Sequence, residues 1–305
     1  MAGPEAALPA QLLKRVPVVL GPTAVGKSAL AFQIAEILGA DLVIADSRQV
    51  YRRLEIATNK PPPADRARIT HHGIDLVAPE ATFNVHQYVA AVSPVLASDT
   101  PVVVEGGSNL YVDALMDGLT LGGVPPRPER RRELDRLSTD RLVTLLRELD
   151  PEAELDFANR VRLVRAIEVL EVAGPPLKSL RTRVPPPWEA VRIGLRMDPE
   201  AHLERIRARC AEQLARGLIE ETQAALEAGV SPSSQALSGT GYAEAVALIQ
   251  GRIAIDQLGE LMARNNRRLA KRQLTWLRRD PRVRWFEADR RPLPAILSYL
   301  KESAK

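Results

Sequence analysis

The chain has 305 residues, a hydrophobic content of 45%, a formal net charge of +4 and one cysteine, Cys210. This length accommodates an α/β core with one additional domain. A single cysteine excludes an internal disulfide and is typical of a reducing cytoplasm. With no apolar run of eighteen residues and no signal-peptide core, we expect a cytoplasmic protein without a membrane span.

A phosphate-loop sequence follows a loose leader, residues 1–15. It lies between an apolar run, Val16–Leu20, and a helical pattern, Ala29–Leu38. Its two glycines let the backbone wrap around an anion, towards which the following helix presents its N–H groups and its dipole. The lysine adds a charge, and the serine is a candidate Mg²⁺ ligand. The residues predicted to bind a diphosphate or a nucleotide are Gly21, Pro22, Thr23, Ala24, Val25, Gly26, Lys27 and Ser28.

Two further strands are predicted, each followed by polar residues. Asp46 follows the strand Asp41–Ala45, and Ser108 follows the strand Pro101–Glu105 and a glycine pair. Because the carboxyl ends of parallel strands face the ligand crevice, Asp46 is a candidate general base or Mg²⁺ partner. The alternatives are a cap for the next turn at Asp46 and a helix N-cap at Ser108.

Two other motifs are interpreted as structural. His71 and His72 are adjacent and lack the Cys or Glu spacing of a zinc site, so we expect loop or packing histidines. The segment Thr58–Pro61 is similar to the guanine-reading box of GTPases, but Pro62 stands where that box needs an acid. We therefore exclude a GTPase switch.

The pattern changes after Leu121. A Gly- and Pro-rich segment, 122–128, precedes purely helical patterns that end at a proline run, 184–187. The sequence therefore predicts an α/β core in two parts, 1–121 and 188–305, interrupted by an all-helical insertion, 122–187. The second part contains a strand, an edge strand and C-terminal helices, predicted at Val191–Leu195, Val283–Phe286, Pro199–Arg216, Leu218–Ala228 and Ile255–Arg279.

Basic residues are concentrated between Arg264 and Arg284, where nine basic residues accompany one acid, Asp280. Positions 267, 271, 274 and 278 share one helix face. Because balancing acids are absent, we interpret this helix as a nucleic-acid surface rather than a solvated amphipathic helix. A second cluster, 127–136, is mixed with acids and is interpreted as a solvated helix face.

In combination, these motifs resemble the tRNA dimethylallyltransferase family over nearly the whole chain. The residues that carry the resemblance are Gly21–Ser28, Asp46–Tyr51, Ile56–Pro61, His71–Asp75, Gly106–Tyr111, Gly241-Tyr242 and Ala270–Arg278.

The resemblance implies a phosphate-loop fold and a reaction. The family transfers a dimethylallyl group from its diphosphate to N6 of the adenine 3′ to the anticodon, in tRNAs that read codons beginning with U. Carried over by motif, Asp46 is the general base, Ser108 positions it or the substrate, and the phosphate loop holds the diphosphate with Mg²⁺ through Ser28. The insertion contacts the anticodon stem, and the enzyme is a monomer. The residues expected to bind tRNA are Asp46, Ser47, Arg48, Gln49, Ser108, Arg130, Arg131, Arg162, Arg165, Arg267, Lys271, Arg272, Gln273 and Arg278.

Three alternatives remain open at this point. A kinase with the same loop predicts phosphoryl transfer from ATP. An isopentenyltransferase acting on free adenylate has no need of the basic helix. An RNA-binding protein that only senses nucleotide predicts RNA affinity without turnover, and a function that survives Asp46→Ala.

Overall fold

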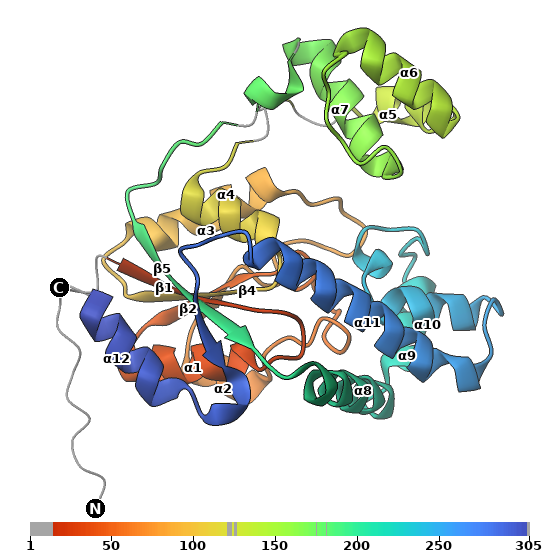
Figure 1. Ribbon diagram of the computed structural model, residues 1–305. Coiled ribbons are helices and arrows are strands. Elements are labelled where there is room, and N and C mark those ends of the chain that lie inside the picture. The colour runs from red at the N-terminus through yellow and green to blue at the C-terminus, as the bar shows by residue number, and fades with distance from the viewer. Residues whose placement is uncertain (1–14, 121–123, 125–126, 175, 181, 304–305) are drawn as a thin grey trace, which may run out of the picture. The chain divides into compact units, whose positions relative to one another are not determined.

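The computed structural model describes residues 15–120, 124, 127–174, 176–180 and 182–303 (Figure 1). The chain forms two compact units, one of residues 116–186 and one of the chain on both sides of it. The predicted insertion, 122–187, overlaps the first unit. Residues 1–14 of the predicted leader and the predicted boundary at 121 lie outside the described residues.

Six strands form one sheet in the order β3-β2-β4-β1-β5-β6, and every pairing is parallel. The predicted α/β fold is therefore confirmed, with the predicted edge strand as β6. Three strands, β4, β2 and β3, lie on one side of β1, and two, β5 and β6, lie on the other, so the strand order reverses beside β1 and β4. Ligands of such sheets bind at the carboxyl ends of the strands where this reversal occurs. The strands are β1 Arg15–Leu20, β2 Asp41–Ala45, β3 His71–His72, β4 Val102–Gly106, β5 Glu189–Arg196 and β6 Arg284–Glu287.

Helices cover both faces of the sheet, α1 and α12 on one and α3 and α4 on the other (Figure 1). Leu30 and Ile34 of α1 share a buried cluster with Ile296 of α12. Coverage of both faces explains why the central strands are continuous apolar runs rather than alternating ones. The helices of this larger unit are α1 Lys27–Leu38, α2 Pro63–Arg68, α3 Val85–Ala97, α4 Asn109–Asp117 (which runs into the insertion), α8 Pro199–Ala215, α9 Leu218–Glu227, α10 Tyr242–Ile249, α11 Ile255–Leu277 and α12 Leu293–Ser303.

The C-terminal helices begin and end close to the predicted residues. Asp198 caps α8 by accepting hydrogen bonds from the backbone N–H groups of Glu200 and Ala201. Gly217 lies between α8 and α9 with φ 91, a left-handed conformation that favours glycine. The long helix α11 packs along α8. No described helix is both long and apolar enough to cross a membrane.

The insertion has a separate hydrophobic core. Leucine side chains at helical spacing, including Leu142 and Leu146, are fully buried against Leu163 and Ile167. Asn159 caps the last helix by accepting a hydrogen bond from Arg162 N–H. The helices of this unit are α5 Pro128–Leu134, α6 Thr139–Leu149 and α7 Arg160–Ala173, with a short 3₁₀ helix, η2 Leu177–Leu180.

Candidate active site

The phosphate loop connects β1 to α1 at the reversal point of the sheet. Gly26 adopts φ 101, which turns the chain into the first helical residue, Lys27. Lys27 is 8% exposed, and its ammonium donates a hydrogen bond to the Pro22 carbonyl at 2.9 Å. Burial lowers the pKa of Lys27, and the nearby Glu105 and Asp46 carboxylates oppose that shift. A buried cation at the N-terminus of a helix is suited to an anionic ligand.

A buried carboxylate lies next to this loop. Glu105, near the end of β4, is 6% exposed, and its Oε1 accepts a hydrogen bond from Ser28 Oγ at 3.2 Å. Burial raises the pKa of Glu105, and the Lys27 charge partly offsets the rise. Sequence reasoning considered the glycines and Ser108 after this strand but not Glu105. Its position at the carboxyl end of a strand was the available signal.

Asp46 and Ser108 lie at the ends of neighbouring strands, β2 and β4. Ser108 Oγ accepts a hydrogen bond from Ser47 N–H at 3.0 Å, and Ser108 N–H donates to the Ala45 carbonyl at 3.2 Å. The half-buried Asp46 accepts a hydrogen bond from Arg48 N–H at 2.7 Å through Oδ1. The Ser108 side chain therefore faces the segment Asp46–Gln49, called the Asp46 segment below. The Ser108 carbonyl accepts hydrogen bonds from the N–H groups of Tyr111 and Val112 in the first turn of α4.

The other two residues of the Asp46 segment have different surroundings. The Arg48 guanidinium donates to the Gln235 carbonyl, which attaches the segment to the chain before α10. The Gln49 side chain is buried, and its Oε1 has no hydrogen-bond partner among the described residues. A buried acceptor without a partner is costly in free energy, so Gln49 Oε1 is an unsatisfied polar atom beside the site.

Helix α8 places basic side chains beside the phosphate loop. No role was assigned to these residues from the sequence. His202 Nε2 donates to the Thr23 carbonyl at 2.8 Å, and Arg209 donates to Thr23 Oγ1 at 2.7 Å. A Cβ on Gly26 would lie 3.4 Å from the Arg205 guanidinium. Burial lowers the pKa values of His202 and Arg209, and the surrounding cations lower that of His202 further. The loop is therefore positively charged on this side.

Helix α11 approaches the loop with one side chain and exposes cations elsewhere. Gln273 accepts a hydrogen bond from Thr23 N–H at 2.8 Å and donates one to the Gly107 carbonyl at 2.7 Å. The four predicted RNA-binding cations of this helix are exposed, and none forms an ion pair with a residue that the structure describes. They are Arg267, Lys271, Arg272 and Arg278.

The insertion places its predicted RNA-binding arginines differently. Arg130 binds Glu171 and Glu133, with its closest ion-pair contact to Glu171 at 2.5 Å. Arg131 and Arg165 both pair with Glu168, whose side chain is fully buried. Arg162 is exposed and has no ion pair among the residues described for this unit.

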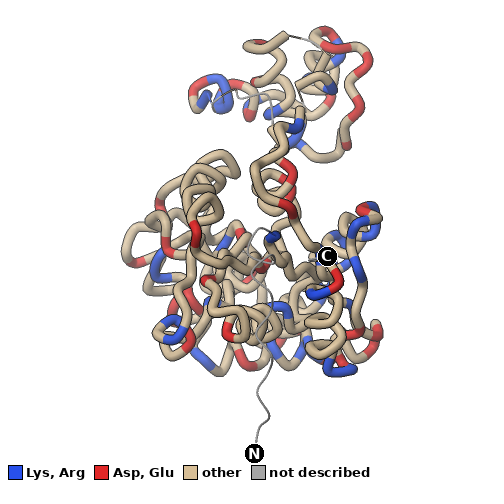
Figure 2. The backbone as a smooth tube through the Cα atoms, turned by 90° about the vertical axis from the view of Figure 1, so that its left-hand side faces the viewer, with Lys and Arg blue, Asp and Glu red and all other residues tan. Residues whose placement is uncertain are grey.

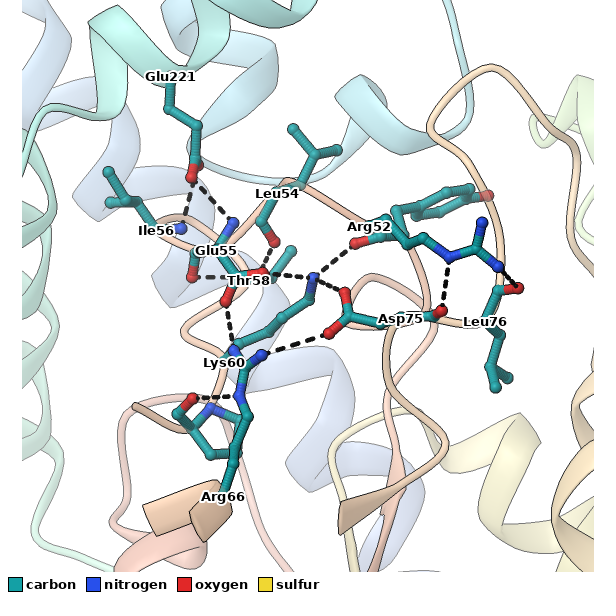
Figure 3. Close-up of polar contacts among 12 residues, drawn as sticks. Arg52, Leu54, Glu55, Ile56, Thr58, Lys60, Arg66, Asp75, Leu76 and Glu221 are labelled. Atoms are coloured by element: carbon teal, nitrogen blue, oxygen red, sulfur yellow. Dashed lines mark hydrogen bonds and ion pairs between the residues drawn. The ribbon is translucent and has the colours of Figure 1, made fainter. Parts of the chain in front are cut away.

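Lys60, from the segment Thr58–Pro61, and Asp75, which follows the histidine pair, meet in one polar network (Figure 3). Lys60 is buried and donates to the Tyr51 carbonyl at 2.6 Å, to Glu55 at 3.0 Å and to Asp75 at 2.5 Å. His72, from the histidine pair, contacts Asp41 at 2.8 Å. The Lys60 contacts fix the chain at Tyr51 and Glu55, directly after the Asp46 segment. These residues therefore stabilise the backbone that carries the site.

An open parallel sheet with a phosphate loop at its reversal point, facing Asp46 and Ser108, defines an α/β protein of the phosphate-loop class. The sequence model described as IPP transferase matches residues 49–280, and the chain belongs to this family. The resemblance inferred from the motifs is thereby confirmed. The phosphate loop and Asp46 precede the matched segment, and longer alignments to individual relatives extend the similarity to about nine-tenths of the chain.

Two curated relatives illustrate the similarity. The tRNA dimethylallyltransferase of Pelotomaculum thermopropionicum is 36% identical over 283 residues, covering 89% of this chain and 90% of the relative. That of a Synechococcus strain is 38% identical over 284 residues, covering 91% and 83%.

Solved structures share the fold. The full-length tRNA isopentenylpyrophosphate transferase of Bacillus halodurans superposes with a TM-score of 0.70 at 27% identity, covering 95% of this chain and 98% of that one. A eukaryotic dimethylallyltransferase acting on tRNA gives a TM-score of 0.77 at 22% identity, covering 90% and 74%, and at that identity supports the fold alone.

Proposed function

We propose that this protein transfers a dimethylallyl group from dimethylallyl diphosphate to N6 of the adenine 3′ to the anticodon, in tRNAs that read codons beginning with U. The products are N6-(dimethylallyl)adenosine and diphosphate. One observation carries the proposal. The half-buried Asp46 lies, like the phosphate loop, at the carboxyl ends of the parallel strands, and its charge acts on Lys27.

Asp46 is the proposed general base. The exocyclic amine of adenine is a poor nucleophile, so removing its proton and holding it in line are the tasks left to the protein. Ser108 supports this role by binding Ser47 N–H, which fixes the backbone beside Asp46. A stacked adenine cannot reach this crevice, so the base must be extruded from the anticodon loop.

The phosphate loop and its neighbours balance the charge of the leaving diphosphate. Lys27 is already buried at the start of α1, and Arg209 contacts Thr23 from α8. Fixed cations and helix N–H groups aimed at developing negative charge stabilise the transition state without reorganising. The same residues bind the diphosphate before reaction.

The residues beside the loop fit Mg²⁺. Ser28 Oγ and the Glu105 carboxylate are both oxygen donors, and they lie 3.2 Å apart. Mg²⁺ takes one or two protein oxygens together with substrate phosphates and water. Ser28 and Glu105 would hold the ion, which neutralises diphosphate charge when bound.

The RNA surface is proposed to combine the exposed α11 cations with the insertion. Arg267, Lys271, Arg272 and Arg278 supply phosphate contacts that are strongest at low salt. Arg162 is the exposed candidate of the insertion. We propose that the enzyme works as a cytoplasmic monomer.

The test is transfer of label from radioactive dimethylallyl diphosphate to an anticodon stem-loop with three consecutive adenines. Asp46→Asn keeps the size of the side chain and removes the base, so we expect a loss of rate of roughly 10²- to 10⁴-fold. Asp99→Asn, on an exposed turn, is the matched control and should retain the rate.

Free AMP is the competing acceptor in the same assay. Label on AMP instead of RNA would replace this proposal with a free-adenylate transferase. Folded protein that labels neither acceptor would restore the kinase and the nucleotide-sensing RNA binder.

A further inference from the structure

Helix α11 has two faces of different chemistry. Its exposed side carries the cations assigned above to RNA, whereas its buried side carries two amides, Asn266 and Gln273, seven residues apart. Residues at this spacing lie on one face, two turns apart. Asn266 binds Arg209, which contacts Thr23 in turn, and Gln273 contacts Thr23 directly. The buried face of the helix is therefore attached to the phosphate loop at two points.

Both polar atoms of the Gln273 side chain already have protein partners. Its amide oxygen accepts from Thr23 N–H at 2.8 Å, its amide nitrogen donates to the Gly107 carbonyl at 2.7 Å, and the residue is 9% exposed. The fit is close, because a Cβ on Gly107 would lie 3.0 Å from Gln273 Nε2. This residue was grouped with the tRNA contacts from its motif alone, and its geometry favours another role.

The two atoms that Gln273 binds belong to the two halves of the site. Thr23 is part of the phosphate loop after β1. Gly107 precedes Ser108, which binds Ser47 N–H beside Asp46 at the end of β2. One side chain thus fixes the separation between the loop proposed to hold the diphosphate and the turn that positions the proposed base.

The same stretch of α11 is anchored to α4. Asn109 Nδ2 donates to the Gln273 carbonyl at 3.4 Å, and Trp276 Nε1 donates to Asp113 at 3.1 Å. The cations Lys271 and Arg272 lie within two residues of Gln273 on the exposed side. RNA bound to Lys271 and Arg272 therefore contacts the same helical turn that contains Gln273.

We propose that Gln273 is a positioning residue that couples RNA binding on α11 to diphosphate binding in the phosphate loop. RNA held by the exposed cations fixes this turn of α11, and Gln273 then holds Thr23 and Gly107 in the geometry that accepts the diphosphate. This inference rests on the proposed function, because it takes RNA and a diphosphate as the two ligands. Such coupling is reciprocal, so each ligand tightens the other by the same factor.

The experiment measures coupling without turnover. Inorganic pyrophosphate with Mg²⁺ is titrated into the full-length protein with and without an anticodon stem-loop, and the stem-loop is titrated with and without pyrophosphate. In the wild type we expect each ligand to tighten the other by about fivefold or more. In Gln273→Leu we expect that factor to fall below about twofold, while RNA affinity without pyrophosphate changes by less than about twofold.

Two further variants keep the test independent of folding. Gln273→Glu keeps an acceptor for Thr23 N–H but places a carboxylate against the Gly107 carbonyl. We expect it to weaken pyrophosphate binding by roughly 5- to 100-fold, the range for an unsatisfied buried polar group. Gly107→Ala presses on Gln273 Nε2 from the other side and should reduce the coupling partially. Thermal melting confirms that each variant is folded.

Gln257→Glu is the matched control. It makes the same chemical change in the first turn of the same helix, where Gln257 is exposed and accepts a hydrogen bond from Ala254 N–H. A glutamate serves that capping role equally well, so both affinities and the coupling should remain at wild-type values.

Steady-state kinetics give a second readout. In Gln273→Glu we expect a raised KM for dimethylallyl diphosphate and an unchanged KM for the stem-loop. A tenfold loss of RNA affinity without pyrophosphate in Gln273→Leu would overturn the proposal, since it would show direct RNA contact. Undiminished coupling in folded Gln273→Leu, or none in the wild type, would also overturn it. Wild-type protein that couples the two ligands but transfers no label would leave this inference standing and refute the proposed reaction.

Discussion

The insertion and helix α11 are both rich in arginine, but they use their charges in opposite ways. In the insertion, Arg130, Arg131 and Arg165 are bound to acids of α7, and this unit carries both acidic and basic residues (Figure 2). In α11, the exposed cations have no described acidic partner, and Asp280 nearby is already bound to Arg192 and Arg282. Charge count therefore predicts RNA affinity poorly, whereas the presence or absence of acidic partners separates structural cations from available ones.

The largest expected effect comes from removing the unpaired charges. The triple variant Arg267→Gln, Lys271→Gln, Arg272→Gln should lower stem-loop affinity by roughly two to three orders of magnitude at about 0.1 M salt. It should also reduce the slope of log affinity against log salt by about two to three, because each phosphate contact releases counterions. Binding isotherms over a salt series give both quantities. An unchanged slope would contradict the assignment of this helix to RNA.

Arg130→Gln is the matched variant in the insertion. Because Arg130 is bound to Glu171 and Glu133, its replacement should change RNA affinity and salt slope much less than one α11 substitution. An equal loss of RNA affinity in Arg130→Gln and in a single α11 variant would show that RNA displaces Glu171 and Glu133 from Arg130. The distinction between paired and unpaired arginines would then be wrong.

A smaller effect is expected from breaking the paired charges themselves. Glu168→Gln leaves Arg131 and Arg165 without their carboxylate and should lower the free energy of unfolding by roughly 2 kcal/mol. Chemical denaturation measures the change, and limited proteolysis locates it in the insertion. Glu152→Gln breaks an exposed pair with Lys178 and should cost less than about 0.5 kcal/mol. Equal costs would indicate that the Glu168 pairs are no more structural than a surface pair.

The smallest effect concerns His202 of α8, which contacts the phosphate loop at the Thr23 carbonyl. Burial and neighbouring cations lower the pKa of His202, so folding favours its neutral form. Its contribution to stability is complete above the ordinary value of 6.5 and is lost as pH falls through the lower folded-state pKa. His202→Gln keeps an N–H donor and removes this titration, so wild-type melting temperature should fall more than that of the variant between pH 7 and pH 5. His86→Gln, at an exposed histidine, should leave the slope unchanged; parallel slopes for wild type and His202→Gln would refute the assignment.

Local patterns were sufficient to predict five of the six strands and much of the site, but β3, His71–His72, was expected to be a loop or packing pair and instead pairs with β2 at the edge of the sheet. The phosphate loop, Asp46 and Ser108 each follow an apolar strand, and parallel topology brings strand ends together without further information. The partners from α8 and α11 were not predictable in this way. Gln273 and Thr23 are separated by 250 positions, and no spacing rule marks a glutamine as a bridge. The ion pairs of the insertion were not predictable for the same reason, since Glu168 and Arg131 meet only after the insertion folds.

The insertion is attached through an antiparallel pair of chain passes. Thr120 N–H donates to the Thr182 carbonyl, and Val184 N–H donates to the Gly118 carbonyl at 3.0 Å. Gly118 has φ 61, and a Cβ there would lie 1.7 Å from the Val184 oxygen, so the passes touch backbone to backbone. The chain enters and leaves the insertion at neighbouring positions. The insertion could therefore be gained, enlarged or lost in evolution without changing the strand order of the sheet, because a short turn would join the two ends. Gly118 permits this close backbone contact, because any side chain there would clash with the Val184 carbonyl.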